Sequence, residues 1–398
     1  MSNHSGPTTG RRQSPGSQTS LRNRNQQRIV EALVKVGPST QADLARRTGL
    51  STATISNIVT KMAESGLVSL SPTTSSGRRA VSVRLLSSNG SVAAGIGFGR
   101  RHLRVVLVFP DYQVAAEESI VLPVGYLPCD GFDLAEQLLK STMQRLGMQP
   151  GALIGIGVGV PGAIDQRSAT PAAGAVALEW ENVNVVSEMQ SRFDVPVVVD
   201  NDANLGSVAE TIWGPYGPIA NLIYLKIGTG IGAGLIINGL PFGGATGVTG
   251  EVGHVEVVTG GIPCRCGNRG CLEAEASISA MLDRLRPTAA AVDSTEQLIA
   301  AALAGDTAVK RVIEDAGLLI GRVLGDLSSI LSPEVIVIGG PLAVLGDSIL
   351  EPISRSFSRH VLPLVKDATE LAISSLDDRG EALGAAALVY HQAALLTA

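Results

Sequence analysis

Three of the four cysteines in this 398-residue chain lie within eight positions, in the segment "CRCGNRGC". Cys264, Cys266 and Cys271 offer three thiolates, and His254, ten residues before the first of them, offers an imidazole nitrogen. One nitrogen and three sulfur ligands make a complete tetrahedral set for zinc, with no position left for a reactive water. The segment therefore predicts a structural zinc site, in a loop that two intervening glycines allow to bend.

The alternative for this segment is a set of three reduced core cysteines without a metal, and the accompanying histidine argues against it. Cys129, the fourth cysteine, lies far from the segment and is expected to be an ordinary, partly buried thiol. The N-terminus lacks the apolar core of a signal peptide, and no apolar run reaches the roughly 18 residues that span a bilayer. We therefore expect a cytoplasmic protein with reduced thiols and no membrane partner.

Basic and acidic residues are distributed unevenly along the chain. Residues 1–84 hold 12 Arg and Lys against three acids, and the rest of the chain holds 19 against 33. A basic head on an acidic body is common when a DNA-binding module is joined to a module that does not bind DNA. Residues 1–24 have almost no large apolar side chains, so we expect a disordered basic tail there, with contact to DNA phosphates as the alternative role.

Apolar residues at helical spacing predict three helices between residues 25 and 66. Ser39 or Thr40 can cap the second helix, which ends at Gly49, and Ser51 can cap the third. Two short helices around "RTGLS" followed by a longer helix with a polar front indicate a helix-turn-helix. The alternating segment that follows, up to about residue 86, is expected to form a two-stranded wing.

The polar front of the third helix and the wing carry the candidate DNA contacts. Side chains on the helix can reach base edges in the major groove, and two wing arginines can hold phosphates or enter the minor groove. The candidates are Ser51, Thr52, Thr54, Ser56, Asn57, Lys61, Arg78 and Arg79. A three-helix packing module without DNA is the alternative, and the basic charge, the turn, the helix front and the wing together argue against it.

Strand-like and helical segments alternate from residue 91 to residue 398 and predict an α/β body. Strands are expected at residues 92–98, 104–109, 153–158, 195–199, 222–227, 233–237 and 335–338. Helices are expected at residues 133–146, 204–212, 295–304 and 308–331. The two halves of the body repeat one theme, in which a strand pair is followed by a strand reached through a helix.

Three short segments of the body are suited to holding a ligand. "VVVDNDAN" places Asn201, Asp202 and Asn204 directly after a buried strand, where such side chains are commonly presented to ligands. "LKIGTGIGAG" and "VIVIGG" are Gly-rich, so their backbones can approach phosphates closely. The candidate phosphate-loop residues are Gly228, Thr229, Gly230, Gly339 and Gly340. Ordinary tight turns and a helix cap are the alternatives, and it is the order of the segments that is informative.

This order of motifs resembles the ROK family of repressors and sugar kinases, which have an actin/hexokinase-like fold. The matching segments are "GVGVPGAID", "ALEWENV", "NDAN", "IGTGIGAG", "GEVGH", "CRCGNRGCLE", "VIVIGG" and a C-terminal "GEALGAAAL". The resemblance covers nearly the whole chain. It implies a two-lobed α/β body with ribonuclease H-like halves, preceded by the winged helix-turn-helix that family regulators carry.

The resemblance also implies a sugar site. His254 is expected to bind zinc through one ring nitrogen and to turn the other toward a sugar hydroxyl, because the two nitrogens of imidazole are distinct. The residues implied for the remaining hydroxyls are Asn201, Asp202, Glu251 and Glu273. For the two glutamates, a solvated charge or a supporting contact to the zinc site is the alternative.

Whether the body is also a kinase depends on its first phosphate loop. In family kinases the residue that matches Asp202 is the general base that takes the proton from the attacking sugar hydroxyl. Those kinases carry a D-x-G-G-T-K type loop, whereas the segment "GIGFGRRHL" has Gly97 in place of the Asp and Arg101 in place of the Thr. Phosphoryl transfer depends on such groups for positioning, so ATP and magnesium are not expected as cofactors.

Together these patterns predict a sugar-responsive DNA-binding regulator, a repressor of genes for carbohydrate uptake or metabolism that has lost kinase activity. The alternative is an ATP-dependent sugar kinase of the hexokinase type that also binds DNA. A redox sensor built on the cysteines is disfavoured, because a closed four-ligand site is normally structural. The expected partners are a double-stranded DNA operator and a monosaccharide, bound by a homodimer or tetramer, since helix-turn-helix regulators commonly bind two half-sites.

Overall fold

The computed structural model describes residues 25–396, apart from residues 27, 31, 34–37, 65–66, 76–77, 86–89, 124, 166–167, 169, 172–179, 181–182, 217–218, 246 and 288–291. The tail predicted at residues 1–24 lies outside the described residues. The chain forms two compact units, which are Met1–Ser91 together with Tyr390–Ala398, and Val92–Val389. We refer to them as the N-terminal unit and the body.

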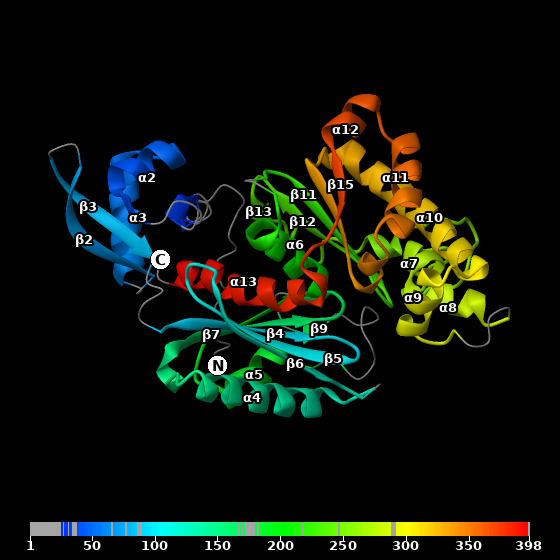
Figure 1. The fold of residues 1–398 in the computed structure, drawn as a ribbon, viewed down its shortest axis with the longest axis horizontal. Helices are drawn as coiled ribbons and strands as arrows, with labels where there is room; N and C mark the ends of the chain where they lie inside the picture. The colour runs from blue at the N-terminus through cyan, green and yellow to red at the C-terminus, as the bar shows by residue number, and fades with distance from the viewer. Residues whose placement is uncertain are drawn as a thin grey trace, which may run out of the picture. The chain divides into compact units, whose positions relative to one another are not determined.

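The N-terminal unit contains a helix-turn-helix followed by a β-hairpin (Figure 1). Its elements after the first helical segment are β1 (Ser39–Thr40), α2 (Gln41–Thr48), α3 (Thr52–Glu64), β2 (Val68–Ser75) and β3 (Arg78–Leu85). The three strands form one antiparallel sheet in the order β1-β3-β2. The predicted winged helix-turn-helix is therefore confirmed.

Side-chain caps and a buried apolar face explain the two helices of this motif. Thr40 rather than Ser39 caps α2, because its hydroxyl accepts a hydrogen bond from the N–H of Asp43 at 3.1 Å. Ser51 caps α3 in the same way, with the N–H of Thr54 at 3.1 Å. The apolar side chains of α3 that the helical spacing placed inside are all buried, namely Ile55, Ile58, Val59 and Met62.

The first half of the body is built on a five-stranded sheet. β4 (Val92–Phe98), β5 (His102–Val108) and β6 (Val114–Val121) form an antiparallel meander. β7 (Leu153–Val160) pairs parallel to β4, and β10 (Val197–Asn201) pairs parallel to β7. The sheet order is therefore β10-β7-β4-β5-β6.

The second half repeats this topology. β11 (Leu222–Ile227), β12 (Ile231–Ile237) and β13 (Leu240–Pro241) are antiparallel neighbours. β14 (Val335–Gly339) and β15 (Glu370–Ile373) continue the sheet parallel to β11. Both sheets thus place their first strand in the centre, and the repeated theme predicted from the sequence is confirmed as two α/β halves.

Helices cover both sheets (Figure 1). From the first half onward they are α4 (Pro128–Arg145), α5 (Val185–Arg192), α6 (Asp202–Trp213), α7 (Leu272–Ala276), α8 (Ile278–Leu285), α9 (Thr295–Leu303), α10 (Thr307–Leu331), α11 (Asp347–His360), α12 (Pro363–Ala368) and α13 (Gly380–Leu396). Each half has its own buried apolar cluster. Among the described residues, no helix combines the length and the hydropathy needed to cross a membrane.

Glycines allow α6 and α13 to approach the sheets backbone to backbone. A Cβ atom at Gly95 or Gly157 would lie 1.9 Å from a carbonyl oxygen of α13, and one at Gly234 would lie 2.2 Å from a carbonyl oxygen of α6. Where the two helices meet, a Cβ at Gly384 would lie 1.9 Å from a carbonyl oxygen of α6. No side chain fits at these contacts, so the depth of both helices against the sheets is fixed.

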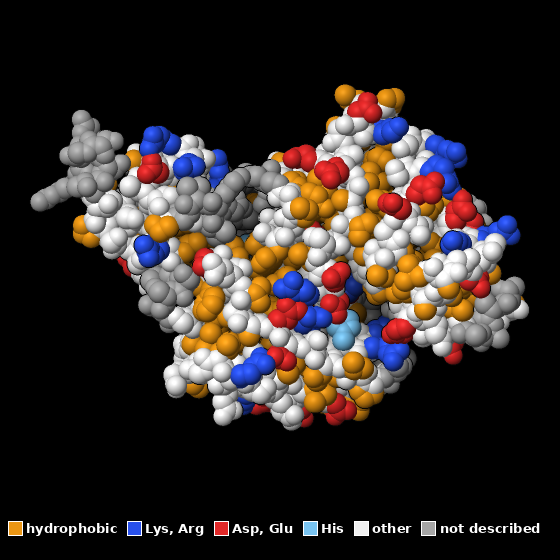
Figure 2. All heavy atoms as spheres, viewed as in Figure 1, with side chains coloured by type: hydrophobic (Ala, Val, Ile, Leu, Met, Phe, Trp, Pro, Cys, Tyr) orange, Lys and Arg blue, Asp and Glu red, His pale blue; other side chains and the backbone are white. Residues whose placement is uncertain are grey.

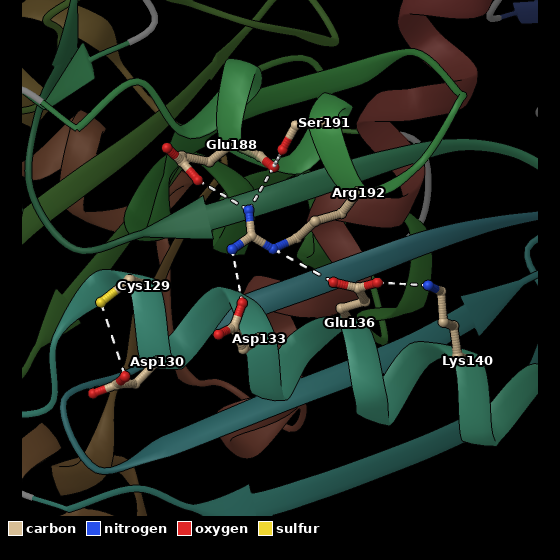
Figure 3. Close-up of polar contacts among 8 residues, drawn as sticks. All are labelled: Cys129, Asp130, Asp133, Glu136, Lys140, Glu188, Ser191 and Arg192. Carbon is tan, nitrogen blue, oxygen red and sulfur yellow. Dashed lines mark hydrogen bonds and ion pairs between the residues drawn. The ribbon is translucent and has the colours of Figure 1, made fainter.

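A cluster of polar contacts joins α4 to α5 (Figure 3). The Arg192 guanidinium donates hydrogen bonds to Asp133 at 2.8 Å and to Glu188 at 2.9 Å, and lies 3.5 Å from Glu136. The hydrogen bond with Asp133 is the main reason that the pKa of Arg192 is raised. The same guanidinium lies over the ring of Phe132, 5.6 Å from its centroid. One side chain thus holds two helices in register on the first half of the body.

Candidate metal and sugar site

The four predicted metal ligands lie together. Their ligand atoms are all within 4.8 Å of one another, and they belong to His254, Cys264, Cys266 and Cys271. Two thiolates bound tetrahedrally to one zinc at ~2.3 Å lie about 3.8 Å apart, and the Sγ atoms of Cys266 and Cys271 are separated by 3.7 Å. The Sγ atom of Cys264 is 3.5 Å from Nδ1 of His254. The donors and their spacing therefore fit a metal of the zinc type.

Two glycines with left-handed backbone shape the loop around these ligands. Gly267 has φ 93° and Gly270 has φ 67°, a region that favours glycine. A Cβ atom at Gly270 would lie 1.7 Å from the carbonyl oxygen of Val258, so no other residue fits there without moving the chain. The N–H of Cys264 donates to the carbonyl of Asn268 at 2.8 Å and closes the turn. The sulfur atoms are brought together by this bend.

His254 lies between the sulfur cluster and an acidic group. It ends the 3-10 turn η3 (Val252–His254), which follows Glu251. Its Nδ1 faces Cys264, whereas its Nε2 is 3.8 Å from Oε2 of Glu251. The two ring nitrogens therefore face two different chemical environments, which is what a histidine shared between a metal and a sugar requires.

Asn201 and Asp202 lie where β10 passes into α6. The Oδ1 atom of Asn201 caps the helix by accepting a backbone N–H at 2.8 Å, which leaves the amide nitrogen as a donor. Asp202 is the first residue of the helix, and its Oδ2 atom is 2.5 Å from Nζ of Lys226. Asn204 donates to Oδ1 of Asp200 at 2.8 Å and so holds the turn together.

Glu251 and Glu273 complete the acidic side of the site. Burial, followed by the charges of Glu273 and Asp202, raises the pKa of Glu251 to about 7. Glu273 accepts a hydrogen bond from the N–H of Ile231 at 3.0 Å and pairs with Nε of Arg265 at 3.1 Å. Glu273 is thus anchored on the Gly-rich hairpin, whereas the Glu251 carboxylate makes no hydrogen bond within the described part of the chain.

Lys226 and Glu381 lie beside Asp202, and neither was predicted from the sequence. The Nζ atom of Lys226 is 3.7 Å from Oε2 of Glu381, and the Glu381 side chain is only 8% exposed. Burial lowers the pKa of Lys226, but Asp202 and Glu381 raise it by more, so the ammonium group stays protonated. The signal that could have found it is a lysine inside the apolar strand "LIYLKI", because a buried charge needs a partner.

The first phosphate loop departs from the kinase pattern in the structure as in the sequence. Gly97 lies in β4, and a Cβ atom there would be 3.2 Å from Cδ of Glu381. The turn between β4 and β5 contains Arg101, whose Nη1 atom is 3.3 Å from Oε2 of Glu296 in α9. Glu381 therefore fills the space beside Gly97, and Arg101, the side chain that would face a nucleotide phosphate, is already paired with Glu296.

The second and third Gly-rich turns are explained by packing. The turn at Gly228, Thr229 and Gly230 is closed by a 2.9 Å hydrogen bond between its two glycines, and Ser279 donates to the carbonyl of Thr229 at 3.0 Å. A Cβ atom at Gly339 would lie 2.1 Å from the hydroxyl of Tyr224. Gly340 has φ 90° and lies against the backbone of β11. Packing within the body therefore excludes a side chain at Gly339 and Gly340, whereas a Cβ atom at Gly228 would make only an ordinary contact at 3.6 Å.

The candidate DNA contacts lie on α3 and at the start of β3. Those on the helix front are exposed or half-exposed, and they are Ser51, Thr52, Thr54, Ser56, Asn57 and Lys61. The hydroxyls of Ser51 and Thr54 are 2.8 Å apart, so both take part in the helix cap. Arg78 and Arg79 open β3 opposite Ser75 and Thr74, and their side chains lie outside the described part of the chain.

Comparison with known families decides where this arrangement belongs. A model described as the ROK family matches residues 93–392. The chain belongs to the ROK family. In this ROK protein a second model, described as the MarR family, matches residues 22–79, which include α2, α3 and β2.

Relatives that match this ROK protein over nearly its full length are regulators by name. A xylose repressor from Caldicellulosiruptor bescii is 29% identical, over 94% of this chain and 97% of its own. The DNA-binding transcriptional dual regulator NagC from Escherichia coli is 28% identical over 92% of each chain. A glucokinase from Halalkalibacterium halodurans is 32% identical, but the match spans 60% of this chain and 77% of its own.

Among solved structures, too, a regulator matches more of this chain than a kinase does. A ROK family transcriptional regulator, described as a homologue of the E. coli MLC protein, has a TM-score of 0.76 at 23% identity and covers 95% of this chain and 98% of its own. A ROK family glucokinase from Streptomyces griseus, in complex with glucose and AMPPNP, has a TM-score of 0.65 at 24% identity and covers 75% of this chain and 99% of its own. The ROK body therefore has the kinase fold.

Proposed function

We propose that this ROK protein is a sugar-responsive transcriptional repressor. The observation that carries the proposal is that one chain combines a winged helix with a polar helix front and a kinase-like body with an acidic cluster around Asp202. Relatives that match along nearly the full chain are named xylose repressor and N-acetylglucosamine repressor. A protein with both sites can convert the binding of a sugar into a change in DNA affinity.

The sugar would bind in the body, and the face of the body drawn in Figure 2 has acidic and basic side chains and one histidine beside a hollow. Sugar hydroxyls both donate and accept hydrogen bonds, so carboxylates, an amide and an imidazole suit them. The residues proposed to bind them are Asn201, Asp202, Glu251, His254 and Glu273. A bound zinc would fix the orientation of one of these side chains, the imidazole of His254, and the fold of the loop that precedes Glu273.

On DNA, α3 would lie in the major groove. The hydroxyl and amide side chains of this helix can bind base edges, and its lysine can bind a phosphate. These candidate residues are Ser51, Thr52, Thr54, Ser56, Asn57 and Lys61. Arg78 and Arg79 of the wing would hold phosphates. The excess of basic residues in the first 84 positions supports this assignment, because phosphate contacts dominate DNA affinity.

The sugar would act by favouring one arrangement of the two body halves. In a homodimer or tetramer, closure of the halves around the sugar would change the relative placement of two winged helices, and with it the fit to two half-sites. Such a change needs a ligand that binds the two arrangements with different affinity, and a difference of a few kcal/mol is sufficient.

An ATP-dependent sugar kinase that also binds DNA is the second candidate, favoured by the kinase fold and by Asp202. Two contacts weaken it. Glu381 occupies the space beside Gly97, and the ammonium group of Lys226 lies 2.5 Å from Asp202. A carboxylate paired with a buried ammonium is a poor proton acceptor, because the ion pair must be broken when it is protonated.

The test is fluorescence anisotropy of the full-length protein on DNA from upstream of its own gene, titrated with monosaccharides at a fixed, stated salt concentration. A sugar that shifts the DNA affinity without ATP supports the repressor and identifies its ligand. A response that requires both sugar and magnesium-ATP would favour the kinase. DNA binding that no sugar alters would overturn the sugar response.

A further inference from the structure

Three charged groups from three elements meet at the inner end of the sugar site. Lys226 comes from β11, Asp202 from the first turn of α6 and Glu381 from the first turn of α13. The Nζ atom of Lys226 is 2.5 Å from Asp202 and 3.7 Å from Glu381. One cation is therefore shared by two carboxylates, and one of these carboxylates is the central residue of the proposed sugar site.

The position of Glu381 is built into the sheet. A Cβ atom at Gly97 would lie 3.2 Å from Cδ of Glu381, and one at Gly159 would lie 2.6 Å from its Cγ atom. Glycines in two neighbouring strands thus leave the room that this side chain fills. Burial raises the pKa of Glu381 to about 7, although the charge of Lys226 opposes the rise. A carboxylate placed so deeply is costly unless an ammonium group is paired with it.

The acidic groups around the proposed sugar outnumber the basic ones. The acids are Asp202, Glu251, Glu273 and Glu381, and the bases are Lys226 and Arg265. Both bases are already paired, Lys226 with two carboxylates and Arg265 with Glu273 at 3.1 Å. A zinc bound by three thiolates would add a further negative charge. A ligand that enters the proposed sugar site therefore meets hydrogen-bond acceptors and a net negative charge.

Two arginines near this group, Arg101 in the turn between β4 and β5 and Arg104 in β5, are also paired with carboxylates. Arg101 pairs with Glu296 at 3.3 Å, and Arg104 of β5 pairs with Asp378 at 2.7 Å. Burial lowers the pKa of His102, so its imidazole is neutral at pH 7. A phosphate monoester carries about 1.5 to 2 negative charges at pH 7, and these groups would not neutralise it.

We infer that Lys226 and Glu381 act as a charge filter that selects an uncharged sugar. The ammonium group neutralises Asp202, which can still accept a hydrogen bond from a sugar hydroxyl, and Glu381 prevents that ammonium group from receiving a phosphate or carboxylate of the ligand. The effector is then a free monosaccharide, and its phosphorylated and acid forms are excluded. This inference rests on the proposed function, in which a sugar binds at Asp202.

The first experiment is calorimetry of the zinc-loaded, full-length protein with matched ligands. The neutral probes are xylose, glucose and N-acetylglucosamine, and their charged counterparts are xylonate for xylose, gluconate and glucose 6-phosphate for glucose, and N-acetylglucosamine 6-phosphate for N-acetylglucosamine. We expect a neutral sugar to bind, and its charged counterpart to bind at least about 100-fold more weakly. A charged sugar that binds as well as or better than its neutral counterpart overturns the filter. If no probe binds, the proposed sugar site itself is wrong.

The second experiment changes the filter. Glu381→Gln frees one side of Lys226, so we expect the affinity for the charged probe, relative to the neutral one, to rise about tenfold. Glu314→Gln, which removes the partner of Arg355 on α11 and touches none of the residues of the proposed site, is the matched control and should leave the ratio unchanged. An unchanged ratio in a folded, zinc-loaded Glu381→Gln variant overturns the inference.

Lys226→Met keeps the inference testable if Glu381→Gln does not fold. It leaves Asp202 and Glu381 as neighbouring carboxylates, and we expect the affinity for the neutral sugar to fall at least about tenfold and to depend more steeply on pH between 5 and 8 than in the wild type. A purely structural role for Lys226 would lower thermal stability without this pH dependence. Unchanged affinity and an unchanged pH profile overturn the role given to Lys226.

Discussion

At the scale of single residues, Asp202 has the most constrained position in the body. It begins α6, pairs with Lys226 and is one of the charges that raise the pKa of Glu251. A side chain so connected can transmit the arrival of a ligand to three elements at once. Its exchange for the isosteric amide therefore tests the site without removing the helix start.

For Asp202→Asn we expect the sugar response to weaken by about 10- to 100-fold in the sugar concentration required, because a hydrogen bond to a charged acceptor is lost. DNA affinity without sugar should stay within about twofold, since the winged helix belongs to the other unit. Anisotropy titrations of the variant and the wild type measure both quantities. A variant with the wild-type sugar response would show that Asp202 does not contact the ligand.

For Cys266→Ser we expect the loss of about one zinc per chain and destabilisation of the body by ~3 kcal/mol or more, because one ligand of a closed site is removed. Metal analysis and thermal unfolding check this. Cys129, which was predicted to be partly buried, is instead exposed, so Cys129→Ser is the control and should change neither quantity. A zinc-free Cys266→Ser protein with wild-type stability would contradict a structural role for the metal.

The grouping of His254 with Cys264, Cys266 and Cys271 could be predicted because all four residues lie in two short segments. Lys226 and Glu381 could not be predicted in the same way, since 155 positions separate them and only the meeting of β11 with α13 makes them a pair. The reason for the glycines at positions 339 and 340 could not be predicted either. From the sequence they are candidates for a phosphate loop, whereas in the structure they are required by close contact with the backbone and side chains of β11.

At the scale of elements, α6 carries a buried acid, Glu210, whose burial is only partly offset by hydrogen bonding. Glu210 of this helix is fully buried, and its Oε1 atom accepts a hydrogen bond from Ser374, just after β15, at 2.5 Å. Its Oε2 atom has no hydrogen-bond partner among the described residues. Burial raises the pKa of Glu210, and the hydrogen bond from Ser374 only partly offsets the rise.

For Glu210→Gln we therefore expect a stabilisation that depends on pH. Above the ordinary value near 4.5, the unfolded carboxyl ionises while the folded one keeps its proton, so the wild type loses stability as pH rises toward the raised pKa. The amide does not titrate. The variant should therefore be more stable than the wild type at pH 8 and equally stable at pH 4, as measured by urea unfolding. Equal differences at both values would exclude this cause.

The polar front of α3 supports a prediction about DNA. Lys61→Ala should weaken binding to all sequences alike and lower the slope of log affinity against log salt by about one, because a phosphate contact is lost. Asn57→Ala should cost ~1–3 kcal/mol on the operator but little on unrelated DNA, because an amide that binds a base edge is lost. Anisotropy at several salt concentrations separates them. Identical behaviour of the two variants would contradict this orientation of the helix.

Most of the regular elements that were expected are present, with ends shifted by a few residues. The strands at 92–98 and 222–227 agree with β4 and β11, because apolar runs of this length are typical of buried strands. β6 was not predicted, since its sequence "VAAEESIV" is half polar and only pairing with β5 makes it a strand. α11 was not predicted, because Pro352 lies within it and proline usually ends or kinks a helix.

At the scale of the whole molecule, the two units have separate apolar cores. The core of the N-terminal unit includes Ile29, Leu44 and Ile55, and those of the body lie on either side of α6 and α13. Units with their own cores can fold independently. The division into two units could be predicted from the uneven charge distribution along the sequence. The grouping of residues 390–398 with the N-terminal unit could not be predicted from it.

We therefore expect a fragment of residues 92–398 to fold, to bind zinc and to bind the sugar with an affinity within about threefold of that of the full chain. It should not bind operator DNA. Calorimetry and anisotropy on the same preparation measure both. Loss of sugar affinity in a folded, zinc-loaded fragment would show that the N-terminal unit contributes to the sugar site.

The contact between Gly97 and Glu381 has a consequence for descent within the family. An aspartate at position 97 would place its Cβ atom 3.2 Å from Cδ of Glu381 and would add a carboxylate beside the one already there, so the Glu381 side chain would have to shift. A change at residue 381 would relieve this crowding but would take one carboxylate away from Lys226. We therefore expect positions 97 and 381 to change together in descent within the family.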